Sequence, residues 1–190
     1  MASWVQRMIG AAKLDAATYE DVEADKTANG QALGVVALSS IAAGVGGLAA
    51  GERGLLGGLV AGLVGWVAAS FLTYVIGARM LPEPQTRADM GEMLRTLGFA
   101  SAPGVLRALG FVPVVGGIIV LAAHVWILFA TVVAVRQALD YTSTGRAVLV
   151  CVIGWFVSLL LWVWIAPSSE SRSWAWPRWG SRGGRGRWSR

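Results

Sequence analysis

The sequence is poor in the residues from which most active sites are built. Its 190 residues include one cysteine and one histidine, and Asp and Glu together number 11. A single cysteine, Cys151, can form neither a disulfide within the chain nor a cysteine-based metal site. No phosphate-binding Gly-Lys-Ser loop is present, and no serine or cysteine nucleophile has a base beside it in the sequence. We therefore predict that the protein is not an enzyme and uses no cofactor or metal.

Charged residues are also scarce, at 14% of the chain against roughly 25% in a typical soluble domain. Apolar residues reach 55% and concentrate in four long runs: Ala32–Ala50, Leu55–Ile76, Val112–Val135 and Ala147–Ala166. A helix needs roughly 20 mostly apolar residues to cross a bilayer, and these runs have that length. The predicted fold is therefore all-α, a polytopic helical membrane protein with four spanning helices.

A fifth apolar segment, Leu97–Leu109, is too short for an ordinary spanning helix and contains Pro103, Gly104 and Arg107. We predict a short re-entrant or interfacial helix here, with a fifth span as the alternative. The positive-inside rule separates the two models. Four spans place 13 of the 16 lysines and arginines on the inner side, whereas five spans divide them into eight and seven with Arg107 buried. The rule favours four spans, with both termini in the cytoplasm.

Three parts follow from these runs: a leader (1–31), a transmembrane domain (32–166) and a tail (167–190). The start of the leader places apolar side chains at helical spacing, namely Trp4, Val5, Met8, Ile9 and Ala12. We predict a short amphipathic helix on the membrane surface, with a frayed terminus as the alternative. An acidic helix over residues 15–27 and a turn at Asn29-Gly30 follow it.

The tail alternates arginine and tryptophan with glycine, and six of the 16 basic residues lie in it. The tail residues expected to contact lipid are Arg172, Arg178, Arg182, Arg185, Arg187, Arg190, Trp174, Trp176 and Trp179. Tryptophan favours the headgroup region, and each basic residue contributes about 1 kcal/mol near an anionic surface. Anionic lipids of the bilayer are therefore the predicted partners. An Arg-Gly tail can also bind RNA, but its position beside a bilayer favours lipid over nucleic acid.

Small residues recur at four-residue spacing in the first two long runs, as Ala43, Gly47 and Gly51 and then as Gly54, Gly58 and Gly62. Small residues on one helical face allow two backbones to approach closely. The four residues between the runs leave room only for a tight turn, so the two helices form an antiparallel hairpin. We expect these faces to pack within the hairpin, with self-association or contact with other membrane proteins as the alternative.

Two ionisable residues fall inside apolar segments, His124 in the third long run and Arg107 in the short segment. Such residues are functional candidates. We expect a neutral His124 that hydrogen-bonds a serine or threonine of another helix, with proton handling as the alternative. Arg107 is expected to reach outward to the lipid phosphates, with a ligand contact as the alternative. Arg136 and Asp140, four residues apart, are expected to pair across a helical turn.

Three stretches together resemble bacterial members of the Yip family, named from Ypt-interacting proteins. They are Thr18–Gly34 (TYEDVEADKTANGQALG), Leu97–Gly110 (LGFASAPGVLRALG) with Val112–Gly117 (VPVVGG), and Trp126–Thr144 (WILFATVVAVRQALDYTST). The resemblance implies a helical membrane domain of about five hydrophobic segments in the bacterial inner membrane, with a cytosolic N-terminus. Eukaryotic members are linked to small GTPases, but their Asp-Leu-Tyr-Gly-Pro motif is absent here, so the resemblance does not imply a GTPase partner.

Two functions from different classes fit this sequence. The first is a non-enzymatic membrane protein that organises membrane or recruits partners, which the leader, the glycine-rich hairpin and the tail favour. The second is a small transporter or channel component, because the interruption around Pro103 is similar to the broken helices that line transport sites. Few polar residues lie at membrane depth, and this favours the first function.

Overall fold

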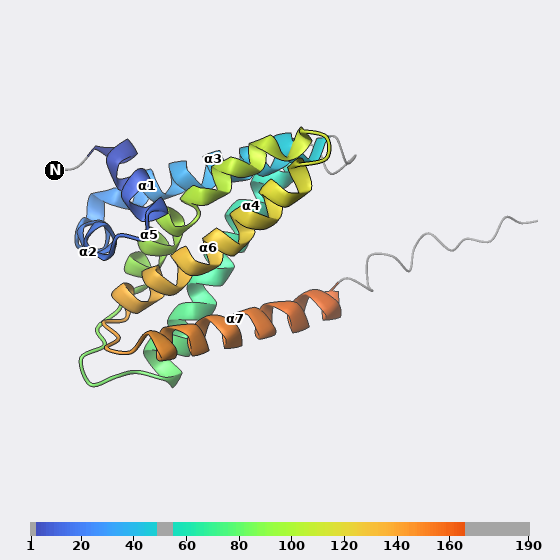
Figure 1. The fold of residues 1–190 in the computed structure, drawn as a ribbon. Coiled ribbons are helices and arrows are strands. Elements are labelled where there is room, and N and C mark those ends of the chain that lie inside the picture. Colours follow the sequence, from blue (N-terminus) through green and yellow to red (C-terminus); the bar gives the residue numbers. More distant parts are fainter. Residues whose placement is uncertain (1–2, 49–54, 166–190) are drawn as a thin grey trace, which may run out of the picture.

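A computed structural model describes residues 3–48 and 55–165, and these form helices joined by short turns (Figure 1). The leader contains α1 (Trp4–Ala12), α2 (Ala16–Ala24) and the 3₁₀ turn η1 (Lys26–Ala28). The elements of the bundle are α3 (Asn29–Gly47), α4 (Leu55–Tyr74) with its π-helical extension η3 (Val75–Met80), α5 (Met90–Ala100), the 3₁₀ helix η4 (Ala102–Phe111), α6 (Gly116–Ala138) and α7 (Thr144–Ile165).

The four long helices predicted from the sequence are confirmed. Among the residues that the structure describes, four helical stretches are long and apolar enough to cross a membrane: Lys26–Gly47, Leu55–Met80, Gly116–Ala138 and Thr144–Leu161. Large apolar side chains point outward from them, as at Leu56 (79% exposed), Val64 (64%) and Leu159 (64%). Proteins surrounded by water rarely expose apolar faces of this size. These faces suit contact with the hydrocarbon core of a bilayer. The all-α membrane fold is therefore as expected, with helix ends shifted by a few residues.

The short segment runs through the bundle beside α3 and in the same direction. Three glycines of the segment lie so close to α3 that a Cβ added to any of them would contact it. Gly98 lies against Ala32, Gly104 against Ser39, and Gly110 against Gly46. The segment thus accompanies α3 from its first turn almost to its last, a path that Figure 1 shows from α5 toward the start of α6.

This course makes the short segment longer than the sequence predicted. The 13 residues of the predicted segment are too short as an α-helix, but the structure joins the 11 residues of α5 to 10 residues of η4. At about 1.5 Å per residue for α and 2.0 Å for 3₁₀, the two cover about 36 Å, more than the hydrocarbon core. The chain therefore traverses the bundle five times, as in the alternative model.

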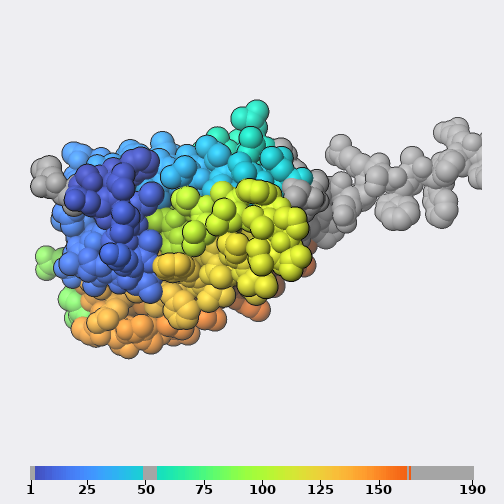
Figure 2. All heavy atoms as spheres, turned by 45° about the horizontal axis from the view of Figure 1, so that its top comes forward, coloured from blue at the N-terminus to red at the C-terminus, as the bar shows by residue number. Residues whose placement is uncertain are grey.

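The two ends of the described chain consequently lie at opposite ends of the bundle. Figure 1 shows α1 and α2 at one end and the last turn of α7 directed to the other. Figure 2 shows the dark blue atoms of the leader at one end of the molecule and the yellow-green atoms around residue 110 toward the other. Residues 90–96, at the start of this segment, lie within α5. The side of the membrane on which each terminus lies stays a prediction.

Pro103 explains why the segment changes its helical form. Proline lacks a backbone N–H and its ring clashes with the carbonyl four residues earlier, so α5 ends at Ala100. The chain then tightens, and Gly104 N donates to Ser101 O at 2.9 Å. A 3₁₀ run of this length is unusual. Here it gains length along the bundle axis, and the absence of side chains at Gly104 and Gly110 lets it lie directly against α3.

The leader is packed onto the bundle. Arg7 on α1 is 3% exposed and donates to Asp21 Oδ2 and Asp25 Oδ2, both at 2.8 Å, which ties α1 to α2 and to the start of η1. Tyr19 is fully buried and its hydroxyl donates to Ala11 O at 3.1 Å. Helix α1 forms over the residues predicted as an amphipathic helix, and its polar face meets α2 while Trp4 remains 38% exposed. Its place on a membrane surface stays a prediction. Asn29 and Gly30, predicted as a turn, form instead the first residues of α3.

Helices α3 and α4 approach each other closely along the part of the glycine stripe that the structure describes. Gly58 lies near Gly44, and a Cβ on Gly62 would overlap the side chain of Ser40. Ser40 and Gly44 therefore form the α3 side of this contact, whereas Gly47 lines a hollow beside η4. Gly51 and Gly54 lie outside the described residues.

Candidate functional site

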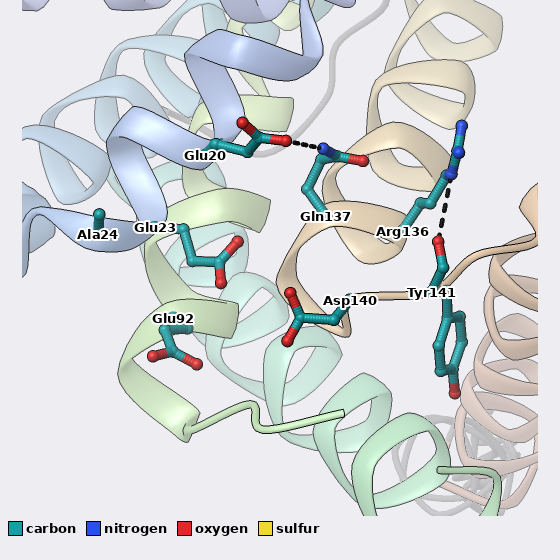
Figure 3. Close-up of a pocket in the computed structure, with 8 residues that line it drawn as sticks. All are labelled: Glu20, Glu23, Ala24, Glu92, Arg136, Gln137, Asp140 and Tyr141. Atoms are coloured by element: carbon teal, nitrogen blue, oxygen red, sulfur yellow. Dashed lines mark hydrogen bonds between the residues drawn. The ribbon is translucent and has the colours of Figure 1, made fainter. Parts of the chain in front are cut away.

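The leader end of the bundle contains a pocket of about 380 Å³. Helix α2 contributes one wall, α5 a second, and the end of α6 with the following turn a third (Figure 3). Its lining residues are Glu20, Glu23, Ala24, Glu92, Arg136, Gln137, Asp140 and Tyr141. Four of these eight side chains are carboxylates, so the pocket is strongly acidic.

Hydrogen bonds fix several parts of this wall. Gln137 Nε2 donates to Glu20 Oε1 at 2.8 Å, which joins α6 to the leader. Glu92 forms a capping box with Asp89 at the start of α5, with contacts of 2.7 and 2.8 Å, so it is held by its own helix. Reciprocal caps of this kind satisfy backbone donors that a helix leaves unpaired. Glu23 and Asp140 are the carboxylates that remain facing the open space in Figure 3.

The expected pair of Arg136 with Asp140 is not formed. Arg136 Nε donates instead to Tyr141 O at 3.3 Å. The reason is local, because α6 ends at Ala138 and Asp140 takes a left-handed backbone conformation with φ of 51°. Residue 140 is thus outside the helix, and the i to i+4 geometry that the prediction required does not exist. The turn directs the Asp140 carboxylate toward the leader, as Figure 3 shows.

Glu23 has the most strongly perturbed ionisation in the pocket. Its pKa is raised from 4.5 to about 7, first by burial and then by the negative charges of Asp140 and Glu92. Arg95 opposes this rise. Arg95 is 3% exposed and donates from Nη2 to the backbone oxygen of Glu23 at 2.6 Å. Near neutral pH the pocket therefore holds a carboxyl group that exchanges a proton readily and that a neighbouring cation would ionise.

Sequence reasoning did not assemble this pocket. Its acids come from α2, α5 and the turn after α6, and their separations along the chain contain no motif. The sequence shows the acidic leader, and it shows Asp140 at the end of an apolar run. It does not show that α5 and α6 lie beside α2, because that follows from the five-traversal course. Across residues 3–48 and 55–165, no group of three or more His, Cys, Asp or Glu is placed to hold a metal ion.

The predicted intramembrane residues, Arg107 and His124, line a different hollow, between α3, η4 and α6. Arg107 does not reach outward, because its Nη2 donates to Ser39 O at 3.1 Å and to Ser39 Oγ at 2.7 Å. His124 Nδ1 lies 2.8 Å from Val120 O of its own helix. This contact takes the place of the expected hydrogen bond to a serine or threonine of another helix. The arginines and tryptophans of the tail lie outside the described residues.

Comparison with known protein families gives one finding. The family model described as the Yip1 domain matches residues 16–165. The match begins at the first residue of α2 and ends at the last residue of α7, so it covers the bundle and the acidic pocket. It confirms the resemblance found in the sequence. No significant match to the chain is found among curated proteins or solved structures.

Proposed function

The chain belongs to the Yip1 domain family, and on that premise we propose that it is a non-enzymatic membrane protein that recruits a partner at the leader end of its bundle. The family and the four apolar helices make it a multi-pass membrane protein. The partner we propose is a protein segment with lysine or arginine side chains, which would enter the acidic pocket.

The observation that carries this proposal is the convergence of carboxylates on a folded leader. Leader helices anchored by the ion pairs of the buried Arg7 present Glu20 and Glu23 opposite Asp140, at the end of a bundle whose sides are apolar. A cationic side chain in the pocket would ionise Glu23 and pair with it in a partly desolvated setting. Charge complementarity of this kind chooses partners and speeds their encounter.

We further propose that the protein resides in the bacterial inner membrane with its leader in the cytoplasm, where soluble partners are available. We expect residues 167–190 on the other side, because α7 is directed away from the leader end of the bundle. Binding of anionic lipid by the Arg and Trp residues of this tail remains a proposal that rests on composition. Self-association through glycine faces also remains a proposal, and the described part of the hairpin uses Gly58 and Gly62 internally.

The test is crosslinking of the tagged, full-length protein in native membranes, with identification of the captured proteins. Glu23→Gln and Asp140→Asn remove pocket charges, and asparagine tolerates the left-handed backbone of residue 140. Asp15→Asn is the matched control, because it removes a leader charge outside the pocket and asparagine caps α2 equally well. We expect a reproducible partner that both pocket variants lose and the control retains. Capture of only the protein itself and lipid, or equal capture by all variants, would contradict the proposal.

A transporter or channel component is the second candidate, and one observation favours it. The crossing segment changes from α-helix to 3₁₀ helix inside the bundle, next to a hollow that contains Arg107 and His124. Interrupted helices commonly line transport sites. Replacement of either residue should then change flux into protein-containing vesicles. Wild-type vesicles that are no leakier than empty ones would remove this candidate.

A further inference from the structure

The hollow between α3, η4 and α6 has a volume of about 500 Å³. It lies on the half of the bundle away from the leader, because η4 passes Ser39 and reaches Gly46 there. Its lining residues are Ala43, Gly46, Gly47, Arg107, Gly110, Gly117, Val120 and His124. Five of the eight are alanine or glycine, so the space exists because side chains are missing from all three walls.

Among the described residues, Arg107 is the one charged member of this lining, and its guanidinium is only partly used. Nε donates to Gly104 O at 3.1 Å, while Nη2 donates to Ser39 O and Ser39 Oγ. Within the described part of the chain Nη1 makes no hydrogen bond, and no carboxylate there forms an ion pair with Arg107. The bonds to Ser39 and Gly104 hold the guanidinium in place, and two N–H groups are left for another acceptor.

His124 adds a second nitrogen to the same lining. Its Nδ1 is occupied by Val120 O, so Nε2 is the nitrogen available to a ligand. The His124 side chain is exposed on the outside of the bundle. Apolar side chains on the neighbouring turns of η4 and α6 are exposed as well: Leu106 is 40% exposed, Leu109 44%, Ile118 67% and Leu121 65%. The polar hollow therefore adjoins a surface suited to hydrocarbon.

We propose that this hollow is a binding site for a phosphate-type oxyanion, held by the Arg107 guanidinium with His124 beside it. A cation at membrane depth is costly unless an opposite charge accompanies it. The guanidinium fork matches the geometry of phosphate oxygens, and the glycines let such a group approach the backbone. The apolar surroundings suit the headgroup of an anionic lipid, and free phosphate has the same chemistry. This site is separate from the acidic pocket and does not depend on the proposed recruiting role.

Gly117 and Gly65 provide a matched pair of variants. A Cβ on either glycine would meet no atom within 4 Å, so both positions accept a side chain without backbone strain. Gly117 lines the hollow, whereas Gly65 lies on the exposed face of α4. Gly117→Leu should fill the hollow, and Gly65→Leu should add the same apolar bulk elsewhere. Arg107→Gln removes the charge, and its folding is checked by comparing its thermal unfolding with that of the wild type.

The experiment measures binding of dodecyl phosphate to the purified full-length protein in a neutral detergent, with inorganic phosphate as competitor. We expect Gly117→Leu and Arg107→Gln to weaken binding about tenfold or more, as loss of a charge-assisted hydrogen bond implies, and Gly65→Leu to leave it unchanged. Binding that inorganic phosphate does not displace assigns a lipid headgroup, and displacement assigns the free ion. Equal binding by all four proteins would overturn the proposal, as would equal loss in Gly117→Leu and Gly65→Leu.

Discussion

Glu23 is the residue whose ionisation depends most on the packing of leader and bundle. Its pKa of about 7 exceeds the ordinary value of 4.5, so the folded protein binds a proton more tightly than the unfolded chain does. The stabilising effect of that proton is complete below about pH 4.5, and it is lost as the pH rises toward 7. The ionised Glu23 carboxylate thus destabilises the fold at alkaline pH. A cationic partner bound in the pocket would offset this effect.

We predict that Glu23→Gln unfolds at a higher temperature than the wild type at pH 8 and at the same temperature near pH 4.5. The gain at pH 8 should be about 1 kcal/mol, because the half-exposed position screens part of the shift. Thermal unfolding of both proteins in one detergent across this pH range measures it. Asp25, whose pKa is lowered to about 2 by Thr27 and Arg7, stays ionised throughout and does not interfere. A constant difference between the two proteins would contradict the pKa assignment.

Arg7 is the residue that fixes the leader. Its two carboxylate partners differ in exposure, with side chains 48% exposed for Asp21 and 19% for Asp25. Removal of the guanidinium leaves both partly hydrated, so Arg7→Met should cost about 2 kcal/mol, less than loss of a fully buried pair. A protease that cleaves after glutamate should then cut α2 at Glu20 and Glu23 faster than in the wild type. The exposed Lys13 supplies the control, and Lys13→Met should leave the cleavage rate unchanged.

At the scale of elements, the contact between α3 and α4 depends on a missing side chain. Gly62 faces Ser40, and any Cβ there must displace that hydroxyl or separate the helices. We predict that Gly62→Val destabilises the protein by about 1 to 3 kcal/mol, the usual effect of overpacking. Gly65→Val, one turn further along the same helix and in open space, should change stability by less than about 0.5 kcal/mol. Thermal unfolding of both variants checks this, and equal losses would mean that valine harms α4 itself.

The elements also show what sequence reasoning could and could not supply. Apolar runs determine α3, α4, α6 and α7 because a bilayer requires about 20 such residues and little else. The course of α5 and η4 stayed open between a short re-entrant helix and a fifth span, because the apolar run is short and the 3₁₀ geometry that lengthens it cannot be read from the sequence. The side-chain partners of Arg107 and Asp140 could not be predicted from the sequence either, because they depend on which helices become neighbours.

At the scale of the whole molecule, five traversals separate two chemically different ends. The acidic pocket and the docked leader lie at one end, and the last described turn of α7 is directed to the other. A recruiting surface and a lipid-binding tail would then act on opposite faces of a membrane. Four crossings would place both on one face, so the topology decides whether the tail could influence a partner bound at the leader.

Labelling of single cysteines in intact cells tests this arrangement most directly. In a Cys151→Ala background, Ser3→Cys reports the leader and Ser189→Cys reports the tail, with a membrane-impermeant maleimide applied before and after permeabilisation. We predict that one of the two is labelled only after permeabilisation and that the other is labelled in both conditions. Labelling of both positions from the same side would contradict the five-traversal course, and with it the separation of the recruiting end from the tail.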